Sequence, residues 1–509
     1  MASATFSHSR VLNAALRSKI MSGDEAAAFI NNGDVVGMSG FTGAGYPKEV
    51  PSALARRSLR LQEKGETLRI SVLTGASTGP ELDGELGAAN AVSFRSPYQS
   101  DPALRKRIND GEANYNDMHL SHLGQQVEYG FYGKMNVAVI EVTAIYEDGR
   151  AIPSTALGNN NTWMAQADKI ILEVNSAQSL ELEGMHDVYY DWGVPPNRKP
   201  IPLTTTGGRV GSSFLHIPIE KVVAVVESNV ADRNSPFKEP DEGSKRIAGH
   251  ILEFLAWEVK KGRLPANLLP LQSGVGNIAN AVLHGLNEGQ FENITSFTEV
   301  IQDGMIALLK SGKMTVASCT AFSLSPEMIE EVNANMKDYK KTIILRPQEI
   351  SNNPGIIRRL GVIAMNAMIE GDIYGHVNST HIMGSKIQNG IGGSGDFARN
   401  ARLTFFMAPS LAGKNGAIST IVPMVSHVDH TEHDTHCIVT DKGLADLRGL
   451  SPRQRARVII DNCADESYKP LLNDYFDRAK KSVGGQTPHI ISEALGFHDR
   501  FIKTGSMKK

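Results

Sequence analysis

The sequence predicts an α/β protein made of two open-sheet domains, and three observations support this fold class. Short runs rich in β-branched residues alternate with segments typical of helices. Several of these runs are continuously apolar, as expected for strands that helices cover on both faces. At 509 residues the chain exceeds one ordinary hydrophobic core, so two domains are expected.

The N-terminal part shows these elements in order. Apolar positions at 11–16 lead into residues 24–30 and predict a first pair of helices. This interpretation is favoured over a transit segment, which the acid-free start of the chain faintly resembles. Glycine-rich corners, at 39–45, 74–80 and 158–162, separate predicted strands. The predicted strands lie at 34–38, 68–73, 137–142, 169–174 and 221–226.

A polar stretch at 231–242, rich in proline, asparagine and charge, predicts a boundary between domains at 1–230 and 231–509. The second part repeats the style of the first, and two such domains side by side would leave a cleft that admits a large substrate. Its predicted elements are a helix at 247–261, a glycine turn at 274–276, strands near 299, at 314–318 and at 342–345, and a glycine-rich segment at 389–397.

Charge and composition argue against several partners. The net charge is −3 and the pI is about 6.6, with no basic tract of five or more residues, so nucleic acid is not the expected partner. No run of about 18 apolar residues occurs, so no segment is expected to span a membrane. Cys319, Cys437 and Cys463 show no CxxC spacing, which favours buried thiols in a reducing cytoplasm.

Two glycine motifs resemble parts of nucleotide-binding sites. Gly274, Gly276 and Ala279 imitate the dinucleotide fingerprint, but a proline in residues 268–272 argues against a buried strand before them. A loop that presents backbone N–H groups to an anion or a carbonyl oxygen is favoured. The glycines of 390–396 serve either a structural turn or the close approach of a ligand to the backbone. They lack the Lys-Ser/Thr pair of a phosphate loop.

Four histidines follow one another at intervals of three residues. On a helix this spacing drifts around the axis, and on a strand it alternates between faces. Because strand-like segments flank it, we interpret this stretch as a polar hairpin or a surface loop and expect no metal site. The histidines are His427, His430, His433 and His436.

Glu299 stands at the end of a β-type run, just before the helix-like residues 305–309. Open α/β sheets place reactive groups where a strand ends and a helix begins. Glu299 is therefore a candidate nucleophile, whereas the alternative is one structural carboxylate among 55 acidic residues.

Seven strings in the chain strongly resemble the acetyl-CoA hydrolase/transferase family, and within it the bacterial succinyl-CoA:acetate CoA-transferases. The resemblance runs from about residue 10 to residue 505. The strings are 41–48, 75–80, 272–277, 298–304, 351–359, 390–397 and 443–449.

The resemblance implies a class I CoA-transferase with two CoA-transferase-like α/β domains, an active site in the cleft between them and, usually, a homodimer. Glu299 matches the family glutamate that becomes a glutamyl-CoA thioester after an acyl-glutamyl anhydride. It implies acyl-CoA and short-chain carboxylates as substrates. Because one carboxylate replaces another, no metal or redox cofactor is expected beyond the coenzyme A thioester itself.

The same resemblance implies the other site residues. The oxyanion donors are the N–H groups of the Gly274-Val275 turn and of Gly393, with the amide of Asn352. Ser77 would contact a substrate carboxylate, with an ordinary turn serine as the alternative. Arg233 and Asp441 would form a supporting charged pair. CoA contacts fall on Leu271, Gln272, Ser273, Gly274, Val275, Asn389, Gly393 and Lys414, the last with a solvated loop lysine as the alternative.

The sequence therefore predicts transfer of CoA from succinyl-CoA to acetate. Three alternatives stay open. A propionyl-CoA:succinate CoA-transferase or an acetyl-CoA hydrolase would use the same Glu299, and a non-enzymatic CoA- or nucleotide-binding regulator would leave Glu299 unmodified.

Overall fold

The computed structural model describes residues 5–6, 9–234 and 238–508. Its contacts divide the chain into two compact units. The domain boundary predicted at residues 230 and 231 stays a prediction, because the units interleave along the chain. The first unit comprises Met1–Phe237, Ser296–Leu309 and Thr315–Leu360, and the second comprises Lys238–Thr295, Lys310–Met314 and Gly361–Lys509.

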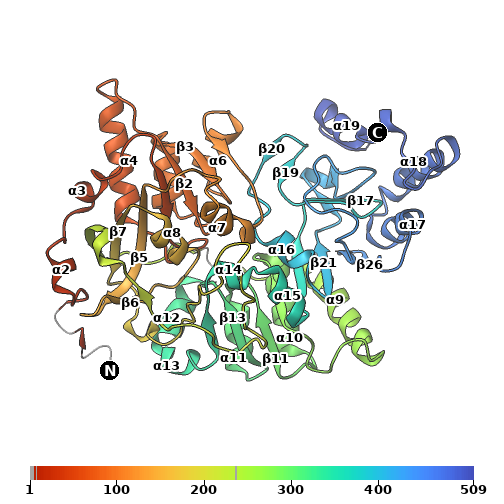
Figure 1. Ribbon diagram of the computed structural model, residues 1–509. Coiled ribbons are helices and arrows are strands. Elements are labelled where there is room, and N and C mark those ends of the chain that lie inside the picture. Colours follow the sequence, from red (N-terminus) through yellow and green to blue (C-terminus); the bar gives the residue numbers. More distant parts are fainter. Residues whose placement is uncertain (1–4, 7–8, 235–237, 509) are drawn as a thin grey trace. The chain divides into compact units, whose positions relative to one another are not determined.

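The first unit contains a nine-stranded sheet in the order β4-β3-β2-β1-β5-β6-β8, with β7 pairing with β5 and β9 (Figure 1). All pairings are parallel except those of β6 with β5 and β8. The five predicted strands of this part are confirmed as β1, β2, β5, β7 and β9. The strands are β1 Val35–Met38, β2 Ile70–Thr74, β3 Val92–Ser96, β4 Asn114–Tyr115, β5 Val137–Ile145, β6 Arg150–Pro153, β7 Lys169–Asn175, β8 Leu215–His216 and β9 Val222–Ser228.

Helices cover both faces of this sheet, which explains the continuously apolar runs. Successive residues of β5 point to opposite faces. Val139 packs in a cluster with Leu54 of α4, whereas Ile140 packs in a cluster with Trp163 of α8. The helices of this part are α2 Ala14–Arg17, α3 Gly23–Ala27, α4 Glu49–Gln62, α5 Glu85–Ala88, α6 Pro102–Asn109, α7 Leu120–Glu128 and α8 Asn160–Gln166.

The predicted first helix pair is confirmed as α2 and α3. Ser22 caps α3 with its hydroxyl, and the Glu25 carboxylate accepts from the Ser22 backbone N–H. This reciprocal capping box satisfies backbone groups that a helix start leaves unpaired.

Residues 296–360 add a smaller set of elements to the first unit. β13 pairs in parallel with β15, and β12 pairs in parallel with β14. The elements are β11 Ile294–Phe297, β12 Val300–Ile301, α11 Asp303–Lys310, β13 Met314–Cys319, β14 Ala321–Phe322, α12 Pro326–Ala334, α13 Met336–Tyr339, β15 Ile343–Leu345, α14 Gln348–Ser351 and α15 Pro354–Leu360.

The second unit contains the strand series β10-β16-β21-β25-β26, parallel except for β26. Short strands and helices complete it. The strands are β10 Leu271–Ser273, β16 Ile363–Ala367, β17 Glu370–Asp372, β18 Val377–Asn378, β19 His381–Ile382, β20 Lys386–Ile387, β21 Leu403–Met407, β22 Leu411–Ala412, β23 Ile418–Ser419, β24 Ile421–Val422, β25 Cys437–Thr440 and β26 Gly443–Asp446. The helices are α9 Glu242–Lys260, α10 Asn277–Glu288, α16 Ser394–Ala398, α17 Pro452–Cys463, α18 Lys469–Ser482 and α19 Gly496–Thr504.

One expectation about this unit is wrong. Residues Leu271–Ser273 form a buried strand, β10, directly before Gly274. Pro270 does not prevent it, because the proline precedes the strand, where a missing N–H breaks no ladder bond. Its carbonyl oxygen still accepts from the N–H of Ile363, 2.9 Å away.

Two composition-based expectations concern the described helices and the three cysteines. No described helix combines the length and the apolar character needed to cross a bilayer. Cys319, Cys437 and Cys463 are free and buried, as predicted.

Candidate active site

Glu299 lies between the end of β11 and the start of β12, and its side chain is half-buried. Hydrogen bonds with residues 318–321 hold the backbone around Glu299. Thr298 N–H donates to the carbonyl oxygen of Ser318 at 2.9 Å, and the Glu299 carbonyl oxygen accepts from the N–H groups of Thr320 at 2.8 Å and Ala321 at 3.1 Å. The carboxylate therefore projects from a rigid turn at the end of a strand, as predicted.

Several of the motif strings meet beside this turn. Val300, the next residue, packs in an apolar cluster with Phe41, Ala44 and Ala76. These residues come from the glycine-rich corners that follow β1 and β2. The carboxyl ends of parallel strands share one edge of a sheet, and open α/β folds bind ligands there. The first unit thus brings the Glu299 segment to the corners that carry Phe41 and Ser77.

The Asn352 side chain forms a hydrogen bond with the Glu299 carboxylate. Its Nδ2 donates to Glu299 Oε1 at 2.9 Å. Asn352 is fully buried and follows α14, and its own N–H donates to the carbonyl oxygen of Gln348. The structure therefore brings together two of the residues predicted for catalysis, with an amide donor on a carboxylate oxygen.

Ser77 is buried in the turn after β2. Its hydroxyl donates to the carbonyl oxygen of Ser39 at 2.7 Å, and its N–H donates to Thr74 Oγ1 at 3.1 Å. This is the arrangement of a turn serine. A hydrogen bond to a substrate carboxylate would require the hydroxyl to rotate, so that role stays a prediction.

The predicted pair Arg233 and Asp441 falls on different units, and each has other partners. Arg233 Nε lies 3.0 Å from Glu81 Oε1. Asp441 Oδ1 accepts from the N–H of Ser410 at 2.6 Å, and Asp441 Oδ2 lies 3.8 Å from Lys442 Nζ. Pairing of Arg233 with Asp441 stays a prediction.

The Gly274–Gly276 turn links β10 to α10 in the second unit. Gly276 adopts φ 115° and ψ −178° at the N-cap of α10, a conformation that favours glycine. Val275 is 57% exposed, so the turn presents itself to solvent. The Gln272 side chain is buried and bonded to β16: its Nε2 donates to Asn366 Oδ1 at 3.0 Å, and its Oε1 accepts from the N–H of Met365 at 3.1 Å. The predicted CoA contact of Gln272 would therefore be made by its backbone.

Residues 427–430, which read His-Val-Asp-His, contact the glycine-rich loop at 390–396 through His430. His430 is buried, with Nε2 3.2 Å from the hydroxyl of Ser394, the residue after Gly393. Asp429 accepts from the Ser379 N–H at 2.6 Å and from the Thr380 hydroxyl at 2.9 Å. Across the described part of the chain, no group of three or more His, Cys, Asp or Glu side chains is arranged to hold a metal ion.

The remaining predicted CoA contacts are also in the second unit. Asn389 precedes the glycine-rich loop, and Gly393 forms the N-cap of α16. Lys414 is exposed, in a short turn after β22. This placement suits both a CoA contact and a solvated lysine.

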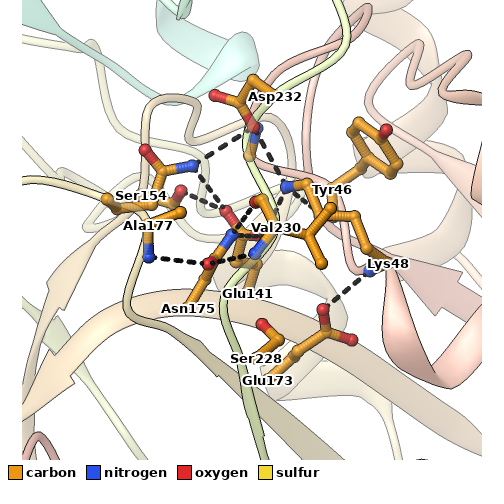
Figure 2. A network of polar contacts seen from close by, with 12 residues as sticks. Tyr46, Lys48, Glu141, Ser154, Glu173, Asn175, Ala177, Ser228, Val230 and Asp232 are labelled. Carbon is orange, nitrogen blue, oxygen red and sulfur yellow. Dashed lines mark hydrogen bonds and ion pairs between the residues drawn. The ribbon is translucent and has the colours of Figure 1, made fainter.

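The first unit contains a buried charge network that the sequence did not predict (Figure 2). Lys48 Nζ lies 2.6 Å from Glu141 Oε2 and 3.0 Å from Asp232 Oδ1. Glu173 accepts from backbone N–H groups at the start of α4, including that of Lys48 at 2.7 Å. Burial raises the pKa of Glu141 to about 7 and also raises the pKa of Glu173.

This network holds the segment that precedes Arg233. Asp232 Oδ1 also accepts from the N–H of Gly45 at 3.1 Å, and the Arg233 N–H donates to the carbonyl oxygen of Gly43 at 2.9 Å. A lone acid inside an apolar strand, such as Glu141 in residues 137–142, was the available signal, because a buried carboxylate requires a partner.

Glu349, three residues before Asn352, is a second buried carboxyl near the site. Its Oε1 accepts from the hydroxyl of Thr162 at 2.6 Å. Burial raises the pKa of Glu349 to about 7. It therefore binds its proton more tightly in the folded chain than in the unfolded chain.

The free energy of unfolding is expected to respond to this group. Its stabilising contribution is complete below the unfolded pKa of about 4.5 and is lost as pH rises through the folded pKa of about 7. Glu349→Gln removes that loss, so the variant should lose less stability than the wild type as pH rises from about 5 to about 7.5. Urea unfolding at each pH measures it, with exposed Glu330→Gln as the control, and equal slopes in Glu349→Gln and the wild type would contradict the assignment.

Comparisons with known proteins agree with these motifs. Residues 6–260 match the acetyl-CoA hydrolase/transferase N-terminal domain, and residues 329–476 match the C-terminal domain of the same family. The first of the similar curated proteins is succinyl-CoA:acetate CoA-transferase of Clostridium kluyveri. It is 52% identical over 499 residues, which cover 98% of this chain and 92% of the relative.

Two further relatives carry other names. Propanoyl-CoA:succinate CoA transferase of Escherichia coli is 46% identical and covers 96% of this chain and 98% of its own. Acetyl-CoA hydrolase of Eremothecium gossypii is 45% identical, with 98% and 97% covered. Among solved structures, RipA of Yersinia pestis matches with a TM-score of 0.69 over 93% of this chain and 99% of its own, at 22% identity, and shows the same fold. The chain is therefore an enzyme of the acetyl-CoA hydrolase/transferase family.

Proposed function

We propose that the enzyme moves CoA from succinyl-CoA to acetate, giving acetyl-CoA and succinate, with Glu299 as the nucleophile. The observation that carries this proposal is the hydrogen bond of 2.9 Å from Asn352 Nδ2 to Glu299 Oε1. It places a fixed amide donor on a carboxylate that stands at the end of a strand. The identity of 52% with succinyl-CoA:acetate CoA-transferase supports this choice of substrates.

The proposed reaction proceeds through two covalent states of Glu299. A carboxylate oxygen of Glu299 attacks the acyl carbonyl carbon, the carbon–sulfur bond breaks, and CoA leaves as a thiolate. The thiolate then attacks the Glu299 carbonyl carbon and releases the first acid, which leaves a glutamyl-CoA thioester. Acetate then takes the place of the first acid, and the two steps run in reverse to give acetyl-CoA. No atom changes its oxidation state, so no redox cofactor is proposed, and the proposal includes no metal.

Negative charge develops on a carbonyl oxygen in each step, and the proposal assigns donors to it. The Asn352 amide stabilises the oxyanion that forms at the Glu299 carbonyl. The N–H groups of Val275 and Gly393 are proposed donors from the second unit, by the family pattern. The CoA contacts from Leu271 to Val275, homodimer formation and a cytoplasmic location belong to the same proposal.

Replacing Asn352 with alanine is expected to lower kcat by about 10²–10³-fold, the usual effect of losing one oxyanion donor. KM for succinyl-CoA should change little, because the donor acts mainly on charge that develops in the transition state. Steady-state measurement of acetyl-CoA formation tests this. Asn335→Ala, at an exposed position at the end of α12, is the control, and an unchanged kcat in Asn352→Ala would remove the proposed donor.

The second candidate function is hydrolysis, favoured by the similarity to acetyl-CoA hydrolases. A hydrolase would use the same glutamate but admit water to the anhydride or the thioester. Release of free CoA from succinyl-CoA, measured with and without acetate, distinguishes the two activities. We expect CoA to pass to acetate, with little free CoA formed when acetate is absent. Rapid release of free CoA from succinyl-CoA in the absence of acetate would favour the hydrolase.

The acceptor acid is tested separately. The Escherichia coli relative is named for propanoyl-CoA and succinate, so propionate is the natural competitor of acetate. Assays with acetate, propionate and 4-hydroxybutyrate as acceptors of CoA from succinyl-CoA compare their kcat/KM. We expect the highest value for acetate, and a higher value for propionate would replace the proposed substrate pair.

A further inference from the structure

The backbone on which Asn352 stands is held by contacts from other parts of the first unit. The Gln348 N–H donates to the carbonyl oxygen of Gly158 at 2.8 Å, and Gln348 Nε2 donates to that of Leu120 at 3.0 Å. The hydrogen bond between Glu349 and Thr162 adds a third attachment. With the backbone fixed, the remaining freedom that matters for the donor is rotation of the Asn352 amide.

A neighbouring hydroxyl sets that rotation. Ser351 Oγ lies 3.0 Å from Asn352 Oδ1 and 3.4 Å from the carbonyl oxygen of Gln348, so its single hydrogen favours the shorter bond to Oδ1, and Ser351 is fully buried. An amide has an acceptor oxygen on one side and two donor hydrogens on the other. Binding Oδ1 to Ser351 therefore leaves Nδ2 directed at Glu299 Oε1, 2.9 Å away. The flipped amide would place its oxygen against the carboxylate, which only accepts hydrogen bonds.

The charge of Glu299 and the hydroxyl of Ser351 both orient the Asn352 amide, but they act differently once the reaction has begun. In the resting enzyme the charge of Glu299 itself favours Nδ2 over Oδ1. In the anhydride and the thioester, Glu299 is neutral, so that electrostatic preference is weakened. Ser351 is unchanged by the chemistry and still holds Oδ1.

We propose that Ser351 is a positioning residue for CoA transfer, which keeps the Asn352 amide hydrogens directed at the Glu299 carbonyl oxygen while Glu299 is acylated. This inference rests on the proposed function. Its chemical effect is on the transition state, because a donor preorganised toward developing charge needs no reorientation during the reaction.

Ser351→Ala is expected to lower kcat by about 10-fold, less than full loss of the donor, because the amide can still rotate into place. KM for succinyl-CoA should stay within about twofold, since substrate binding is not altered. Ser351→Thr keeps the hydroxyl and should recover most of kcat. Ser325→Ala, which removes the N-cap of α12, is the matched serine control and should lower stability without lowering kcat.

A double-mutant cycle separates this role from general support of the fold. If Ser351 acts through Asn352, Ser351→Ala should have no further effect on kcat in an Asn352→Ala enzyme. A further 10-fold loss in that background, or an unchanged kcat in Ser351→Ala alone, would overturn the inference. Hydride trapping of Glu299 in Ser351→Ala, after incubation with succinyl-CoA, shows whether the covalent mechanism itself still stands in either case.

Discussion

Replacing Glu299 with alanine is expected to lower kcat for CoA transfer by about 10⁴-fold or more, as found when a covalent nucleophile is removed from an enzyme. Alanine has no oxygen that can attack the acyl-CoA carbonyl, so neither the anhydride nor the thioester can form. We expect the effect to come from chemistry and not from folding, because the backbone bonds of Glu299 to Thr320 and Ala321 do not involve its side chain. Acetyl-CoA formation from succinyl-CoA and acetate measures the loss.

Glu327→Ala provides the matched control for that experiment. Glu327 is an exposed glutamate in the first turn of α12, and its removal should leave kcat unchanged. Urea unfolding of both variants checks that the fold is retained. A Glu299→Ala enzyme that keeps kcat within about tenfold of the wild type would contradict the assignment of the nucleophile.

Replacing Lys48 with methionine is expected to lower the free energy of unfolding by about 3–5 kcal/mol, the usual cost of removing one partner of a buried ion pair. Methionine preserves most of the side-chain volume but leaves the buried Glu141 and Asp232 carboxylates without their ammonium partner, which lies 2.6 and 3.0 Å away. Urea unfolding at neutral pH measures the change.

An exposed lysine gives the comparison. Lys245 pairs with Glu242 at 2.9 Å but is 58% exposed, so Lys245→Met should change the free energy of unfolding far less than Lys48→Met does, because solvent screens an exposed pair. Glu141→Gln combined with Lys48→Met should cost less than the sum of the two single changes, because both remove the same interaction. Equal effects at Lys48 and Lys245 would show that the network contributes little.

Much of the candidate site was predictable because its signals are local. The run before Glu299, with helix-like residues behind it, predicted a carboxylate at the end of a strand, and the structure places Glu299 between β11 and β12. The resemblance to the family supplied Asn352, which the structure places against the carboxylate. The run that became β5, apolar apart from Glu141, predicted a strand covered on both faces, which the two core clusters confirm.

The features that were missed depend on contacts between distant residues. Lys48 and Glu141 are 93 residues apart, and Lys48 and Asp232 are 184 apart, so no local pattern joins them. β10 was missed because the proline rule was applied to the whole segment 268–272, although Pro270 lies one residue before the strand. The interleaving of the two units also arises from such contacts, since Ser296–Leu309 belongs with the N-terminal segment.

Covalent capture of Glu299 tests the central claim most directly. The enzyme is mixed with succinyl-CoA, treated with borohydride, digested and examined by peptide mass analysis, with Glu299→Ala treated in parallel. Borohydride reduces a glutamyl thioester to an alcohol, so we expect the wild-type peptide that contains residues 298–304 to carry a reduced side chain at Glu299. The Glu299→Ala peptide should be unchanged. A wild-type enzyme that turns over while Glu299 remains an unmodified carboxylate, or that is reduced at another residue, would contradict the mechanism.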